Sequence, residues 1–225
     1  MYKKFLELFG RENLLEQALV TTITMLESDL EMFLASVDSL RRKDDATLPF
    51  DIYEKDKEIN RYEHDVRRKV LTHLTIAGTH NIVPGLALVS IVIDVERIGD
   101  YTKNITELAQ AHPTRLNPGQ VEADLAFVEQ VTQERFDRII QILKDSDFDM
   151  ARQVMHDHRE ISSRCDTVLN DIISGKFEDL SNADAVVLAL YFRYLKRIAA
   201  HLTNIASSIV NPFPKIGFKY ENGDH

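Results

Sequence analysis

The chain has 225 residues, and its 44% hydrophobic content is enough for a buried core and unlike that of a disordered chain. With 27 basic and 36 acidic side chains the net charge is −9, which repels phosphate backbones and makes nucleic acid a poor candidate partner. The single cysteine excludes an internal disulfide framework and fits a reducing cytosol, so we expect a cytoplasmic protein.

Six helices are predicted in chain order, in keeping with a sequence that has only eight Gly and six Pro. Ahead of them, Phe5, Leu6, Leu8 and Phe9 form a short apolar group. Glu7 interrupts the group, and the stretch is far too short for a signal peptide. It either packs on the end of the protein's own helices, which we favour, or forms an amphipathic arm against a partner or a membrane surface.

The first three helices form one set. Over residues 15–40, apolar residues recur in steps of three or four and so share one helix face. Pro49 marks the connection to a second helix over about 51–76. Pro84 stands where the first turn of a helix tolerates proline, and it opens a third helix over 84–111.

The last three helices form a second set. Asn117 is predicted to be the N-cap of a fourth helix over about 118–144. A fifth helix is predicted over about 149–173. A sixth begins after Ser181, which forms a capping pattern with Asp184.

A repeat links the two sets, because residues 94–105 return in altered form as residues 194–205. Five pairs are identical without a gap: Leu88/Leu188, Arg97/Arg197, Ile98/Ile198, Asn104/Asn204 and Ile105/Ile205. We therefore predict an all-α chain with two three-helix repeats, residues 10–112 and 117–211, followed by a tail over 212–225. Long helices joined by short loops pack most simply as one elongated six-helix bundle.

Acidic residues recur at helical spacing in the first repeat only. Glu96 and Asp100 lie one turn apart, on the face opposite the apolar stripe of the third helix. On the second helix, Asp56, Asn60 and Glu63 line one edge. If these helices pack side by side, the two edges supply four or five oxygen ligands for hard divalent or ferric ions.

Ordinary ion pairs account for the same residues without a metal. Glu63 can pair with Arg67, and Glu96 with Arg97 or Lys103, while the remaining acids face water. A ferritin-type di-iron centre is disfavoured, because none of the eight His has a Glu three positions before it. Clustered His/Cys spacing of the zinc type is also missing from the sequence.

The combination of motifs resembles the PhoU family. The segment 96–100 reads Glu-Arg-Ile-Gly-Asp and is followed by Asn-Ile at 104–105, which matches the family's segment on its third helix. On the second helix the family carries an Asp, then Ile/Val-Asn, then Glu, and Asp56, residues 59–60 and Glu63 fit that pattern.

The resemblance spans about residues 10–210 and implies two tandem three-helix PhoU-like repeats. It implies a cytoplasmic, often dimeric regulator of phosphate transport and phosphate-starvation signalling, which links a phosphate transporter to a sensor histidine kinase. Such a protein reaches the membrane only through its partners. It also implies bound metal ions, iron or zinc among them, and the ligands carried over by position are Asp56, Glu63, Glu96 and Asp100.

The second repeat departs from this pattern. None of the residues at its matching positions is acidic; they are Lys196, Ala200, His158, Ser162 and Cys165. We therefore expect metal in the first repeat only, with Lys196 offsetting negative charge nearby. A remodelled site of His158, Cys165 and His201 is the alternative, although scattered residues of this kind more often serve packing and surface.

Three functional readings follow from these residues. The leading one is a metal-binding adaptor that is not an enzyme, since no Ser–His or Cys–His grouping is suggested by the spacing. The enzymatic alternative is a metal-dependent hydrolase or oxidase in which a metal at Glu96 and Asp100 activates water. The third is a purely structural helical scaffold.

Overall fold

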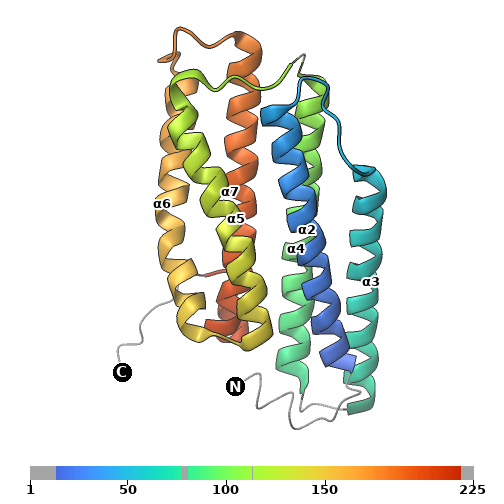
Figure 1. Cartoon of the computed structure of the whole chain (residues 1–225). Helices are drawn as coiled ribbons and strands as arrows, with labels where there is room; N and C mark the ends of the chain where they lie inside the picture. Colours follow the sequence, from blue (N-terminus) through green and yellow to red (C-terminus); the bar gives the residue numbers. More distant parts are fainter. Residues whose placement is uncertain (1–13, 78–80, 113, 219–225) are drawn as a thin grey trace, which may run out of the picture.

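The computed structural model describes residues 14–77, 81–112 and 114–218, so Phe5, Leu6, Leu8 and Phe9 lie outside the described residues. Six long helices stand side by side in an elongated bundle (Figure 1), which confirms the predicted all-α fold. In chain order the elements are α2 (Leu14–Arg42), α3 (Ile52–Ala77), α4 (Ile82–Ala111), the 3-10 turn η2 (Gly119–Val121), α5 (Glu122–Asp145), α6 (Phe148–Ile173), α7 (Asn182–Val210) and the 3-10 turn η3 (Phe213–Lys215). In these ranges no helix is long and apolar enough to cross a membrane.

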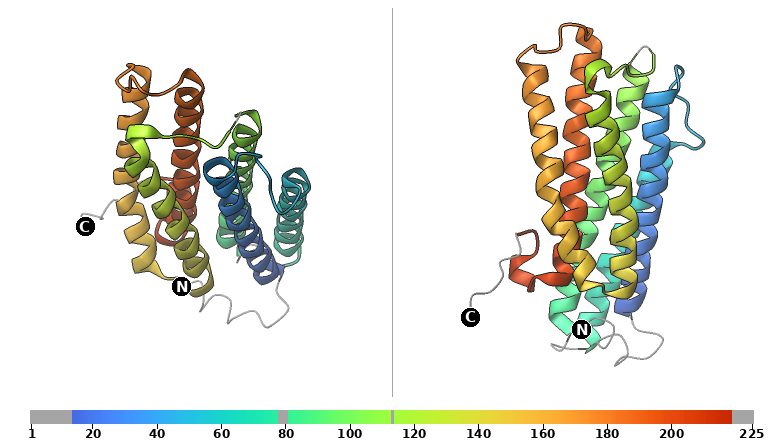
Figure 2. Two further views of the ribbon diagram at one scale, coloured as in Figure 1. Left: turned by 45° about the horizontal axis from the view of Figure 1, so that its top comes forward. Right: turned by 60° about the vertical axis from the view of Figure 1, so that its left-hand side comes forward.

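The bundle consists of two three-helix units (Figure 2). Helices α2, α3 and α4 pack against one another, and so do α5, α6 and α7. The units meet mainly through α4 and α7 and less extensively through α2 and α5, which leaves α3 and α6 at opposite edges (Figure 1). The third helix of each unit therefore forms the main contact between the two repeats.

The core comes from the apolar stripes of the helices. Ile98 of α4 is fully buried, and so is its repeat equivalent, Ile198 of α7. The repeat thus preserves the buried register of the third helix. Between the units, Phe33 of α2 packs on Phe136 of α5 with ring centroids 5.4 Å apart.

The sixth helix begins as predicted, whereas the fourth begins later than predicted. Ser181 Oγ accepts a hydrogen bond from the Asp184 backbone N–H at 3.0 Å and caps α7. Asn117 does not cap an α-helix, because its Oδ1 accepts from the Gly119 N–H at 3.2 Å within a turn. Gly119 has a φ of +52°, which an α-helix cannot include, so α5 begins only after η2, at Glu122.

Part of the segment 212–225 folds back on α7. The Asn211 side-chain amide donates a hydrogen bond to the backbone oxygen of Lys215 at 2.9 Å. The Gly217 N–H donates to Ser207 Oγ at 2.7 Å. The described part of this segment is thereby held against the end of the helix.

Candidate acidic site of the first repeat

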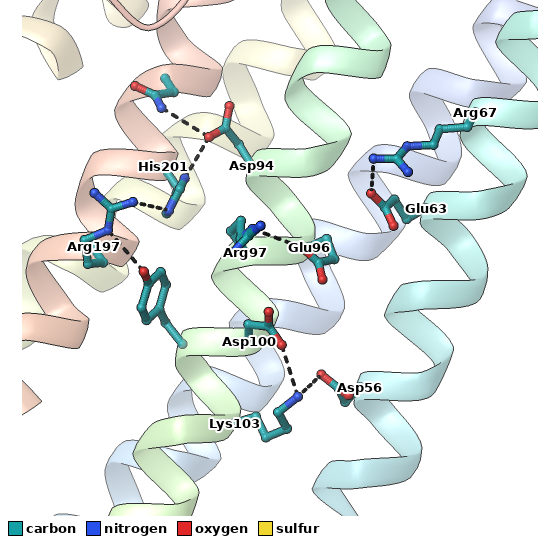
Figure 3. Close-up of polar contacts among 12 residues, drawn as sticks. Asp56, Glu63, Arg67, Asp94, Glu96, Arg97, Asp100, Lys103, Arg197 and His201 are labelled. Carbon is teal, nitrogen blue, oxygen red and sulfur yellow. Dashed lines mark hydrogen bonds and ion pairs between the residues drawn. The ribbon is translucent and has the colours of Figure 1, made fainter.

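The four predicted metal ligands come from two adjacent helices. Asp56 and Glu63 project from α3, and Glu96 and Asp100 project from α4 (Figure 3). The two helices pack against each other, so the two acidic edges face one another. We call the surface formed by these four carboxylates the acidic surface.

A lysine lies at one end of the acidic surface. Lys103 Nζ is 2.9 Å from Asp56 Oδ1 and 3.0 Å from Asp100 Oδ1, so one ammonium group bridges α3 and α4 (Figure 3). Burial lowers the pKa of Lys103, but its hydrogen bonds to the two carboxylates outweigh this effect and raise the pKa overall. Lys103 is therefore protonated and compensates both acids.

The other two acids pair within their own helices. Glu63 Oε1 lies 2.7 Å from Nη2 of Arg67, one turn further along α3, while Glu96 Oε2 lies 3.6 Å from Arg97 Nε. Burial raises the pKa of Glu96, and the negative charges of Asp100 and Glu63 raise it further. Glu96 is thus only weakly compensated by its arginine.

A fifth carboxylate, which the sequence analysis did not identify, lies behind the acidic surface. Asp29 of α2 is 0% exposed, and neither of its carboxylate oxygens has a hydrogen-bond partner among the described residues. A Cβ on Gly99 would lie 2.8 Å from Asp29 Oδ1, so the missing side chain of Gly99 makes room for the carboxylate. Burial raises the pKa of Asp29 well above its usual value, and the charges of Glu96 and Asp56 add to this.

The sequence does contain a signal for this residue. Asp29 follows Leu26 by three positions and precedes Phe33 by four, and both of these belong to the predicted apolar stripe. An acid in phase with a buried stripe is unusual, because a carboxylate is seldom buried without a partner.

The acidic surface suits a hard cation, although its cation in the structure is Lys103. Its donors are all carboxylate oxygens, the ligands that hard divalent and ferric ions prefer. The unpartnered Asp29 fits a cation close by, since a positive charge would compensate for its burial. Among the described residues, however, no three His, Cys, Asp or Glu side chains are already grouped as metal ligands. A metal ion would therefore have to displace Lys103 and draw the carboxylates together.

In the second repeat, His158, Cys165 and His201 do not converge. Cys165 is fully buried, and burial raises the pKa of its thiol to about 12. His201 faces α4 instead, where its Nδ1 lies 2.7 Å from Asp94 Oδ1 (Figure 3). These three side chains therefore form no metal-ligand group in the described part of the chain.

Known proteins share this arrangement of helices. The profile of the PhoU domain matches two segments of the chain, residues 22–109 and 128–209, one in each three-helix unit. A phosphate-specific transport system accessory protein PhoU homolog from Xylella fastidiosa is 25% identical over 201 residues, which are 87% of this chain and 83% of that protein. Another from Synechocystis sp. is 28% identical over 171 residues, 72% of each chain. The crystal structure of PhoU from Pseudomonas aeruginosa superposes with a TM-score of 0.79 at 20% identity, covering 87% of this chain and 95% of that one.

Proposed function

This chain belongs to the PhoU family, and from that premise we propose that it is an accessory protein of a phosphate transport system. The observation that carries the proposal is the match of both repeats to the PhoU domain, joined by relatives named as accessory proteins of such a system. In its finer form the proposal is a cytoplasmic regulator, acting as a homodimer, that links a phosphate transporter to a sensor histidine kinase. It would reach the membrane only through these partners.

The proposed role is binding rather than catalysis. A metal-dependent hydrolase would need, beside the acidic surface, a general base that is not itself one of the proposed metal ligands. The basic side chain that bridges this surface is Lys103, which two carboxylates keep protonated. The Cys165 thiol is a poor nucleophile, because burial raises its pKa to about 12. These groups favour an adaptor that acts through its surfaces.

We further propose that the acidic surface holds a metal ion, iron or zinc, in the first repeat only. Asp56, Glu63, Glu96 and Asp100 would supply the ligands, and the buried carboxylate of Asp29 supports the idea because it lacks any partner among the described residues. A bound cation would supply the positive charge that holds α3 against α4, a role that Lys103 fills in the structure.

The partner proposal is tested by copurification and by deletion. A tagged copy of the chain, expressed at its natural level, should copurify with components of a phosphate transporter and of a sensor kinase from detergent-solubilised cells. Deletion of its gene should alter the expression of a phosphate-responsive reporter, and the intact gene should restore it. If neither partner copurifies and the reporter is unchanged, the proposed role is wrong.

The metal proposal is tested separately by elemental analysis of the purified protein. Wild type should carry metal, and Glu96→Ala/Asp100→Ala should lose it while keeping its helical circular dichroism. The matched control is Glu27→Ala/Glu31→Ala, an exposed pair of acids with the same spacing on α2, whose ion-pair partners are Lys144 and Lys55. Equal metal content in both variants would mean that the acidic surface is not the site.

A further inference from the structure

The first helices of the two repeats bury an acidic and a basic side chain at the same position. Their buried residues follow one spacing: Leu19, Thr22, Leu26, Asp29, Phe33 and Ser36 on α2, and Leu125, Val128, Thr132, Arg135, Ile139 and Ile142 on α5. Arg135 therefore takes the place of Asp29, and it is 2% exposed. Lys196 and Ala200 of α7 likewise stand where α4 has two acids.

Among the described residues no carboxylate forms a salt bridge with Arg135, although the negative charge of Asp157 partly offsets its burial. Its Nη1 donates a hydrogen bond to Thr203 Oγ1 at 2.9 Å and lies 3.2 Å from His158 Nδ1. Its Nη2 is buried, and within the described ranges it has no hydrogen-bond partner. Burial lowers the pKa of Arg135 to about 10, so the guanidinium is still charged at neutral pH. A buried charge of this kind is costly unless an anion compensates it.

A groove beside α6 and α7 lies next to this guanidinium. Its lining includes His158 and Thr203, the two side chains that Arg135 contacts, together with Ser162 and Ala200. Ala200 presents only a methyl group where the first repeat has a carboxylate. An anion that enters here therefore meets no acid at that position.

The acids that line the rest of the groove are already paired with basic side chains. The pairs are Asp124 and Glu160 with Arg164, Asp157 with Arg138, Asp166 with Lys196, and Asp171 with Lys176. Their negative charge is thereby partly compensated, whereas the positive charge of Arg135 is offset only in part, by Asp157, which itself pairs with Arg138. The groove thus combines paired acids with a guanidinium that is buried behind its lining and forms no salt bridge among the described residues.

Arg135 also determines where His158 carries its proton. Because a guanidinium can only donate, His158 Nδ1 is the acceptor of this contact and Nε2 holds the proton of the neutral ring. Burial lowers the pKa of His158 to about 4, with the charges of Arg135 and Lys196 acting in the same direction. His158 Nε2–H and the Ser162 hydroxyl are therefore hydrogen-bond donors among the side chains that line the groove.

We propose that the second repeat binds a small tetrahedral oxyanion of the phosphate class in this groove, against Arg135. His158 and Ser162 donate hydrogen bonds to the anion, and the guanidinium of Arg135, which lies behind the lining in contact with His158, supplies the attracting positive charge. Charges that are buried or partly buried attract each other more strongly than exposed charges, because water screens them less. This site is independent of the regulatory role proposed above.

The test is a titration of the purified full chain with inorganic phosphate by isothermal titration calorimetry, with potassium chloride holding the ionic strength constant. Wild type should bind one phosphate per chain, and Arg135→Met, which removes the positive charge, should weaken binding at least about tenfold. Arg164→Met is the matched control, because Arg164 lines the groove itself but pairs with Asp124 at 3.1 Å. Its affinity for phosphate should change less than about twofold.

Thermal unfolding checks the same variants for folding. Phosphate should raise the Tm of wild type and of Arg164→Met, but not that of Arg135→Met. Without phosphate, Arg135→Met should be at least as stable as wild type, since an apolar side chain replaces an unpaired charge. A parallel titration with phosphoserine distinguishes free phosphate from a phosphoryl group attached to a larger molecule. If both ligands bind, the groove accepts any phosphoryl group. If phosphate alone binds, the groove is specific for the free anion. Failure of wild type to bind phosphate, or equal binding by Arg135→Met, overturns the proposal.

Discussion

The buried carboxylate of Asp29 should make the metal-free chain less stable as the pH rises. Its pKa is raised, above all by burial and then by the charge of Glu96. Above the usual Asp pKa of about 3.9, the folded chain therefore keeps a proton that the unfolded chain has released. Because the unfolded state then binds fewer protons, the free energy of unfolding should fall between this value and the raised pKa, by up to about 1.4 kcal/mol per pH unit.

Asp29→Asn isolates this contribution, because the amide has nearly the same shape and cannot ionise. Chelator-treated wild type and variant would be unfolded in urea at steps from about pH 4 to 8, followed by circular dichroism. For each protein the free energy of unfolding is plotted against pH. The slopes of wild type and variant should differ by an amount that corresponds to up to one proton. Asp38→Asn is the matched control, since Asp38 lies on the same helix but is 37% exposed and pairs with Lys43 at 3.1 Å. An Asp29→Asn slope equal to that of wild type would refute a protonated Asp29.

Three further predictions concern the bridge, the core and the thiol. Lys103→Met should leave Asp56 and Asp100 uncompensated and lower the stability of the metal-free chain by about 1 kcal/mol, a modest figure because Asp100 is 39% exposed. It should also tighten divalent-metal binding in calorimetry, and unchanged affinity would show that Lys103 does not compete with the metal. Phe33→Ala should cost about 3–5 kcal/mol in urea unfolding, since this fully buried ring lies between the repeats, and a loss below about 1 kcal/mol would contradict that packing. Cys165 should react with a thiol reagent only after denaturant is added, because burial raises its pKa to about 12, and rapid reaction of the native chain would contradict its burial.

Helix periodicity was sufficient to predict the fold and the place of the acidic surface. An i,i+4 spacing alone puts Glu96 and Asp100 on one face, whatever the helix packs against. The pairing of these acids could not be predicted in the same way. Arg97 and Lys103 both lie within two turns of Glu96, and only the packing of α3 on α4 decides that Lys103 reaches across to Asp56. Which side chains pair across two helices depends on how the helices pack, and the spacing of residues along one helix does not determine that packing.

The two buried ionisable residues, Asp29 and Arg135, were missed for a related reason. Charged residues on an amphipathic helix usually face water, and a single exception within an apolar stripe is easily assigned to the edge of that stripe. Whether Asp29 is buried depends on a residue seventy positions later, because Gly99 leaves the space that its carboxylate fills. The equivalence of Asp29 and Arg135 emerges only when the buried positions of α2 and α5 are set side by side.

Side-chain length explains how one backbone arrangement supports two opposite sites. Asp29 is short, so its carboxylate stays between α2 and α4 and requires the bare backbone of Gly99 opposite. The longer Arg135 reaches Thr203, which stands in α7 where α4 has Lys103. The first repeat thus buries a carboxyl group behind a surface whose cation comes from its third helix. The second buries a cation from its first helix behind a groove that has lost the matching acids, so a cation ligand suits one repeat and an anion ligand suits the other.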